Sequence, residues 1–225
     1  FLTSEALAVS PELQYNRLAT IHTILEKKCI VITNLMGYLR FLPSKEKYQQ
    51  FFVELSVGKE FNPQKLVEKL VQAGYTRDTI VNKSGEFAVR GFIIDIFPVE
   101  NDKPIRVEFF DDEIESIRFF DCDTQKSLSN ISSILIRPCT EFLTDKKVLE
   151  EECFKQKYLP MYEKVSSILE YLDSAITFFK DYEQLKVSFH QIMEEVMTYQ
   201  SSKDIKFTGQ YMFDFNSISV EFPIY

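Results

Sequence analysis

The spacing of apolar residues changes along this chain, and that change limits the fold more than any other feature. Between Gly85 and Pro138, several runs have apolar residues at every second position, which is typical of strands with one buried face. Four strands are predicted there: Phe87–Arg90, Phe92–Phe97, Ile105–Phe110 and Ile131–Arg137. A turn rich in Pro, Asn and Asp separates the second strand from the third. This segment therefore predicts a mainly antiparallel sheet.

A helix is predicted directly before this sheet, at residues 61–74. Asn62 is a capping residue, and Pro63 occupies the first helical position. Gly74 stands where a glycine commonly ends a helix. The apolar stripe consists of Leu66, Val67, Leu70 and Val71. The strand-rich segment is therefore expected to have this helix packed against its sheet.

The residues before position 60 predict alternating helices and strands. Ser10-Pro11-Glu12 is typical of a helix start, because a capping hydroxyl precedes a proline and an acid. A short buried strand is predicted at Cys29–Thr33, followed by a short helix that ends at Pro43.

The last third of the chain also predicts helices and strands. Residues 146–172 are expected to be helical, with a break at Pro160. Ala175–Phe179 predicts a buried strand, and Leu185–Val196 has the spacing of an amphipathic helix. The tail from Phe207 alternates weakly, as short strands do. The predicted fold class is therefore α/β, with a first part at residues 1–60, an inserted α+β domain at 61–145 and a second part at 146–225.

Composition excludes several classes of protein. The 225 residues carry a net charge of −8, which argues against binding nucleic acid through its phosphates. Cys29, Cys122, Cys139 and Cys153 form no CxxC pair, so reduced thiols in a cytoplasmic protein are expected rather than zinc or disulfides. We predict neither a membrane span nor a signal peptide. Because the chain does not begin with Met, it is interpreted as a piece of a longer protein.

No catalytic, cofactor-binding or metal-binding residue is predicted. The chain contains neither GxxxxGK[ST] nor GxGxxG, the loops that hold nucleotide phosphates. The acidic runs Asp111–Glu113 and Glu150–Glu152 are interpreted as solvated turns or helix faces. His22 and His190 each lie alone on a predicted helix, which favours packing or surface roles.

Three side chains on the predicted sheet point to a binding surface instead. Strand alternation puts Arg106 and Phe110 on one face of Ile105–Phe110, and Arg90 on the corresponding face of a neighbouring strand. An arginine beside an exposed ring is typical of a protein–protein contact. A second interpretation is that Phe110 is buried under the flanking helix and Arg106 forms a cross-strand ion pair.

Long motifs in this region resemble a known family. GEFAVRGFIIDIFP, PIRVEFFDDEIESIRFFD and DTQKSL are similar to the UvrB-homology module of the bacterial transcription-repair coupling factors. The resemblance is dense over residues 60–145, thinner over 1–60 and weakest after 146. Phe92, Asp111 and Asp112 depart from the family pattern, in which glycine is frequent after VRG and before DEI.

This resemblance implies a fold and a partner. It implies a degenerate P-loop-NTPase-like domain without an ATP site, split in two by an inserted domain that binds UvrA, the damage-recognition ATPase of nucleotide excision repair. The family residues that contact UvrA correspond to Arg90, Arg106 and Phe110. This piece would then be a non-enzymatic recruiting module that binds no cofactor.

The resemblance also implies roles for domains absent from these residues. RNA polymerase and double-stranded DNA would bind to those domains, and ATP and magnesium would act in the motor domains of the full-length protein. Two other interpretations of the sequence remain. One is a fragment of UvrB, the excision-nuclease subunit with a similar inserted domain, and the other is a small nucleotide hydrolase.

Overall fold

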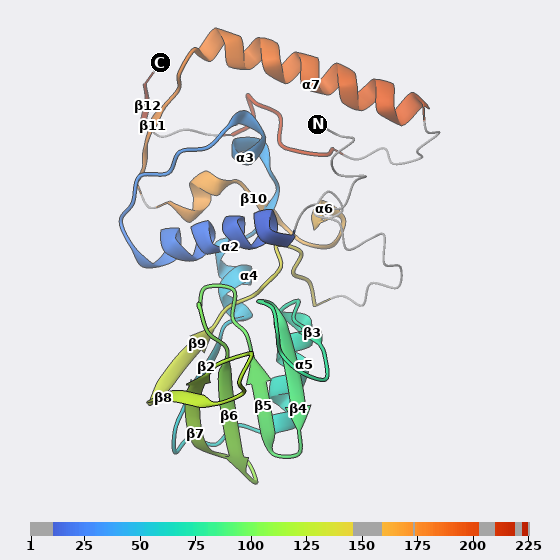
Figure 1. Ribbon diagram of the computed structural model, residues 1–225. Helices are drawn as coiled ribbons and strands as arrows, with labels where there is room; N and C mark the ends of the chain where they lie inside the picture. Colours follow the sequence, from blue (N-terminus) through green and yellow to red (C-terminus); the bar gives the residue numbers. More distant parts are fainter. Residues whose placement is uncertain (1–10, 146–158, 173, 203–209, 219–221, 225) are drawn as a thin grey trace. The chain divides into compact units, whose positions relative to one another are not determined.

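The computed structural model describes residues 11–145, 159–172, 174–202, 210–218 and 222–224. They divide into two compact units (Figure 1). One unit contains the described residues up to 14, those from 23 to 45, and those after 158; the other contains 15–22 and 46–145. The predicted domain boundaries at residues 60 and 145 stay a prediction.

The second unit is built on a six-stranded sheet with its strands in chain order (Figure 1). The strands are β3 (Thr76–Arg77), β4 (Glu86–Arg90), β5 (Ile93–Ile96), β6 (Ile105–Phe110), β7 (Glu113–Phe120) and β8 (Ser127–Ile131). Every neighbouring pair is antiparallel except β3 with β4. The chain is thus a mixed α and β structure with a mainly antiparallel sheet, as predicted.

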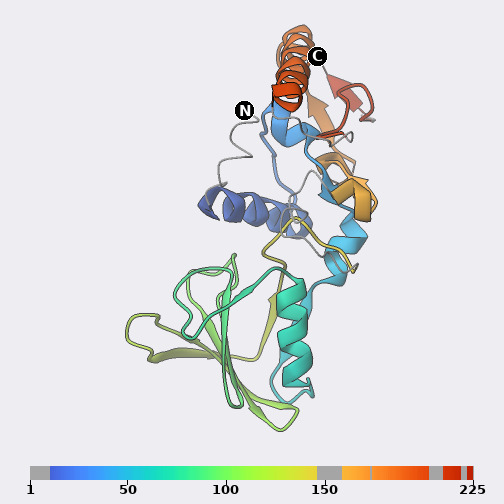
Figure 2. The ribbon, with the colours of Figure 1, turned by 90° about the vertical axis from the view of Figure 1, so that its right-hand side faces the viewer.

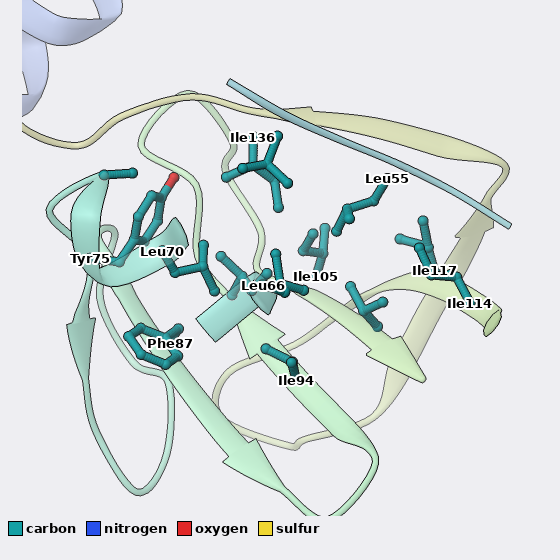
Figure 3. Close-up of a cluster of buried hydrophobic side chains, with 14 of the residues drawn as sticks. Leu55, Leu66, Leu70, Tyr75, Phe87, Ile94, Ile105, Ile114, Ile117 and Ile136 are labelled. Atoms are coloured by element: carbon teal, nitrogen blue, oxygen red, sulfur yellow. The ribbon is translucent and has the colours of Figure 1, made fainter. Parts of the chain in front are cut away.

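Only one face of this sheet carries the main core. Helix α5 (Pro63–Gln72) packs on this inner face, and so does a small antiparallel sheet of β2 (Val53–Ser56) and β9 (Ser133–Ile136). Figure 2 shows α5 running beside the sheet. Figure 3 shows Leu66 and Leu70 of α5 among the buried side chains of the strands, which include Ile94 and Ile105. The outer face of the sheet, opposite α5, therefore does not contribute to this core.

The ends of α5 follow the predicted capping pattern. The side chain of Asn62 accepts a hydrogen bond from the Lys65 N–H, with an N–O distance of 3.0 Å, and Pro63 begins the helix. Gly74 has a φ of +90°, a left-handed conformation that suits glycine. Close beside it, Thr140 fills the space into which a side chain at position 74 would project.

Gly74→Ala is expected to destabilise the second unit more than Gly58→Ala. Both glycines have a positive φ, so either alanine should cost about 1 kcal/mol in backbone strain. A Cβ at position 74 would also lie 2.6 Å from Thr140 Cγ2, whereas nothing lies within 4 Å of one at position 58. Urea unfolding of both variants measures the difference, and equal losses of stability would contradict the close approach.

The first unit draws its core from both ends of the chain. Tyr38 and Leu39 lie on α3 (Leu35–Leu39), and Phe189 lies on α7 (Tyr182–Ser202). These side chains form one buried cluster with Phe215, from beyond α7. Helix α2 (Pro11–Glu26) is shared by both units, and α4 (Lys45–Gln50) leads into the second unit. The remaining elements of the first unit are β1 (Leu42–Pro43), α6 (Leu159–Tyr162), β10 (Val165–Ser166), a 3-10 helix (Ile168–Tyr171), β11 (Ile176–Phe178) and β12 (Phe222–Ile224).

The predicted buried strand at Cys29–Thr33 is wrong. These residues form neither helix nor strand, and Ile30 and Ile32 are 91% and 93% exposed. A strand needs a neighbour to satisfy its backbone groups, and no described residue pairs with this segment. The strand predicted at Ala175–Phe179 does form, as β11, and pairs in parallel with β12. Its Ile176 and Phe178 are exposed, so the predicted burial is wrong.

The helix predicted at residues 146–172 is only partly testable. Residues 146–158 lie outside the described residues, as does part of the predicted strands after Phe207. Pro160 is the second residue of α6, and the residues before Leu159, where the predicted break would fall, lie outside the described residues. After α6 the chain forms β10 and a 3-10 helix instead of continuing as an α-helix.

Candidate partner-binding surface

The outer face of the six-stranded sheet carries the charged side chains. Pairing places Asp95 of β5 between Ala88 of β4 and Arg106 of β6, and places Arg106 opposite Arg118 of β7. Directly paired residues point to the same side of a sheet. The residues that alternate with them, such as Ile94 and Ile105, lie in the inner core. The charged residues therefore share the face opposite α5.

Asp95 is the centre of this face. Its side chain is only 3% exposed, and both of its oxygens accept hydrogen bonds. Arg106 donates from Nε to Oδ1 at 2.7 Å and from Nη2 to Oδ2 at 2.9 Å. Arg90 donates from Nη2 to Oδ2 at 2.5 Å. One buried carboxylate thus holds two arginines that come from the strands on either side of it.

Arg106 is held on three sides. Its Cζ lies 4.5 Å from the centre of the buried Phe120 ring, and its Nη2 donates to Gln125 Oε1 at 3.1 Å. Its hydrogen bonds to Asp95 raise the pKa of the guanidinium. The side chain is 12% exposed, against 47% for Arg90. Arg106 is therefore mostly enclosed by its neighbours, whereas nearly half of the Arg90 side chain is exposed to solvent.

A second ion pair lies beside the first. Arg106 and Arg118 face each other across the strands, which places like charges together. Arg118 turns away and donates to both oxygens of Glu108, and Ser116 also donates to Glu108. The hydrogen bonds from Arg118 are the main cause of a lowered Glu108 pKa. Each arginine of the facing pair therefore has its own carboxylate.

Phe110 ends β6 on the same face and is 72% exposed. Its neighbour Phe109 points inward and is 4% exposed, as strand alternation requires. The chain then turns at Asp111, whose φ is +52°, and Phe110 pairs with Glu113 of β7. The interpretation in which Phe110 is buried under a helix is therefore wrong.

The three residues predicted from the sequence share one face but differ in their surroundings. Arg90 and Arg106 meet at Asp95, while Phe110 lies roughly 13 Å along β6 from Arg106, since a strand rises about 3.3 Å per residue. We call Arg90, Asp95, Arg106 and Phe110 the outer-face patch. Asp95 was missed from the sequence, although a single acid within the apolar run FIIDIF signals a buried charge that needs a cation.

No described helix is long and apolar enough to cross a membrane. Among the described residues, no group of three or more His, Cys, Asp or Glu side chains could hold a metal ion.

Comparison with known proteins places this face within a recognised domain. Residues 53–142 match the family model described as the UvrB interaction domain. The transcription-repair-coupling factor of Bacillus subtilis is 37% identical over 143 residues, covering 63% of this chain and 12% of the relative. That of Staphylococcus aureus is 34% identical over 202 residues, covering 88% of this chain and 17% of the relative. All four residues of the outer-face patch fall inside the matched domain.

This chain spans less than a fifth of the length of these relatives. Its similarity to the Staphylococcus aureus protein nevertheless extends well beyond the matched domain. The resemblance predicted from the sequence is thus confirmed: this chain is similar to the part of the transcription-repair coupling factors that contains the UvrB interaction domain.

Proposed function

We propose that this chain is a docking module that binds UvrA and so recruits it to a stalled RNA polymerase. The outer-face patch carries the proposal, because it lies within the residues that match the UvrB interaction domain. It combines a buried carboxylate, two arginines and an exposed ring on one face of a sheet. This composition is common at the energetic centres of protein–protein interfaces.

Each residue of the patch has a distinct proposed role. Arg90 is half exposed, so its remaining N–H groups are available to a carboxylate on UvrA. Phe110 would supply apolar area that loses water on binding. Arg106 is mostly enclosed, and it contributes chiefly by holding its neighbours and by its charge.

The rest of the recruitment process is proposed to involve other parts of a longer protein. RNA polymerase and double-stranded DNA would bind through domains outside these 225 residues. ATP and magnesium would act in motor domains that also lie outside them. The relatives support this division only through their name, transcription-repair-coupling factor, and their greater length. The proposed location of the process is the cytoplasm.

The first unit is proposed to be a degenerate P-loop-like domain that the second unit interrupts. Its core supports this, because Tyr38 from before the interruption packs with Phe189 and Phe215 from after it. The chain contains no GxxxxGK[ST] loop, so we propose that it neither binds nucleotide nor hydrolyses ATP. ATP turnover that co-purifies with the chain would contradict this and would favour a nucleotide hydrolase.

The direct test of docking is capture of UvrA on the immobilised chain. We expect purified UvrA to be retained at low salt and to be released as salt rises, because the contact includes charged groups. Free UvrB should compete if both proteins use the same type of domain. Retention that no excess of UvrB reduces would place the contact elsewhere on the chain.

A further inference from the structure

The outer-face patch contains one carboxylate for two guanidinium groups. The two hydrogen bonds from Arg106 already give each carboxylate oxygen of Asp95 a donor. Arg90 nevertheless also donates to it, from the opposite neighbouring strand, which brings two cations to one acid. The three side chains keep a net charge of +1 on a chain whose total charge is −8. Satisfying a buried acid therefore does not by itself explain the arrangement.

The neighbouring ion pair shows what a self-contained arrangement looks like. Arg118 and Glu108 pair one to one, and their side chains are exposed to a similar degree. Asp95, in contrast, is enclosed, while nearly half of the Arg90 side chain is exposed to solvent. The buried Asp95 carboxylate thus orients both arginines through the hydrogen bonds that it accepts from them.

We propose that Asp95 is the positioning residue of the outer-face patch: it orients Arg90 and Arg106 together, so that the patch accepts a carboxylate of the partner. This inference rests on the proposed function, because the partner is UvrA. A guanidinium binds a carboxylate best when its planar edge is already aimed, since less side-chain entropy is then lost. Asp95 uses one edge of Arg90 and leaves the rest of that guanidinium for the partner.

Asp95→Asn separates positioning from simple charge attraction. The change keeps the size of the side chain and makes the patch more positive by one charge. If the patch attracted an acidic partner by charge alone, the variant would bind UvrA more tightly. If Asp95 positions the arginines, binding should weaken about tenfold or more. The direction of the change in Kd therefore decides between the two.

Glu108→Gln is the matched control. It also removes one negative charge from the same face, but its carboxylate is hydrogen-bonded to Arg118, and its interaction with Arg106 is electrostatic only. UvrA should bind this variant with a Kd within about twofold of the wild type. In an Arg90→Ala, Arg106→Ala background, Asp95→Asn should have little further effect on binding, since there is no arginine left to position. A persisting loss in that background would overturn the proposal.

Two measurements keep the proposal testable if Asp95→Asn does not fold. Arg90→Lys keeps the charge on an exposed side chain but loses the planar fork, so it should weaken UvrA binding. In the free wild-type chain, NMR should show the Arg106 Nε–H exchanging more slowly with water than that of the exposed Arg77, because Asp95 accepts a hydrogen bond from it. Unchanged binding by Arg90→Lys, or an unprotected Arg106 Nε–H, would overturn the proposal.

These measurements also distinguish failure of the inference from failure of the proposed function. If the wild-type chain does not bind UvrA, the proposed function is wrong, while the NMR measurement still shows whether Asp95 holds Arg106. If the wild type binds and Asp95→Asn binds equally well or better, the proposed function stands and the positioning role is wrong.

Discussion

Replacing Phe110 with alanine is expected to weaken UvrA binding by at least about 2 kcal/mol, which corresponds to roughly thirtyfold in Kd. The ring is 72% exposed in the free chain, so its removal leaves no cavity in the core. The free energy of unfolding should therefore change by less than about 0.5 kcal/mol. Calorimetric titration with UvrA measures the first quantity, and urea unfolding measures the second.

Phe178→Ala is the matched control for Phe110→Ala. Phe178 is 73% exposed, so the two substitutions remove the same side chain from similarly exposed sites. It lies on β11 in the first unit, whereas the outer-face patch belongs to the second unit. The control should bind UvrA as the wild type does. Equal losses in both variants, or none in Phe110→Ala, would remove Phe110 from the interface.

The second large expected effect concerns the stability of the second unit in acid. His22 on α2 is 3% exposed, and its Nε2 lies 2.7 Å from the hydroxyl of the buried Tyr48. Burial, with a smaller contribution from the nearby Arg137, lowers the pKa of His22 to about 3. Glu100 lies 3.7 Å from its Nδ1 but is itself paired with Arg137. The imidazole is therefore neutral in the folded chain.

The sign of the pH dependence follows from this lowered pKa. An unfolded chain protonates His22 near pH 6.5, whereas the folded chain resists protonation down to about pH 3. The stability contributed by the neutral imidazole is thus fully present above pH 6.5 and is lost as the pH falls toward 3. Between pH 7 and pH 5 the loss should reach about 2 kcal/mol. Urea unfolding at each pH, followed by NMR of the Ile94 and Val107 amides, measures the free energy of unfolding of the second unit.

His22→Gln should remove most of this slope between pH 7 and pH 5, because glutamine does not titrate. His190→Gln is the control, since His190 is an exposed residue of α7 in the first unit. That variant should keep the wild-type slope. Carboxylates such as Glu108, whose pKa is lowered, lose their contribution only below about pH 5, outside this window. A slope that His22→Gln leaves unchanged would show that His22 is not the group responsible.

Local sequence patterns predicted the regular parts of the second unit. The Asn62 cap, the proline at the first position of α5 and the glycine after its end are all confirmed. Strict alternation in β6 placed Arg106 and Phe110 on one face, because burial there depends only on strand geometry. These features depend on nearest neighbours in the chain, so one sequence suffices to predict them.

β7 shows why the same reasoning fails elsewhere. No strand was predicted from the sequence at residues 113–120, because its buried residues Ile114, Ile117 and Phe120 recur at every third position. The structure explains the spacing. Pairing with β6 shifts by one residue at Glu108, which keeps Ile114 and Ile117 on the inner face. Phe120 is buried on the outer face instead, under the Arg106 guanidinium.

Asp95 was missed from the sequence for a related reason. The burial of Asp95 depends on arginines from β4 and β6, which lie five and eleven residues away in the chain. Its role follows from pairing between strands and not from the pattern within β5. The wrongly predicted strand at Cys29–Thr33 shows the opposite error. Its apolar sequence predicts burial, but no described strand pairs with it and its isoleucines are exposed.

The measurement that tests the central claim most directly is calorimetric titration of UvrA with the wild-type chain and with an Arg90→Ala, Phe110→Ala variant. Both residues are exposed, whereas removal of Arg106 would leave the buried Asp95 with a single partner. We predict saturable binding by the wild type and a loss of at least about 2 kcal/mol in the variant, with an unchanged circular dichroism spectrum. Equal binding by the two proteins, or no binding by the wild type, would contradict docking of UvrA on the outer-face patch.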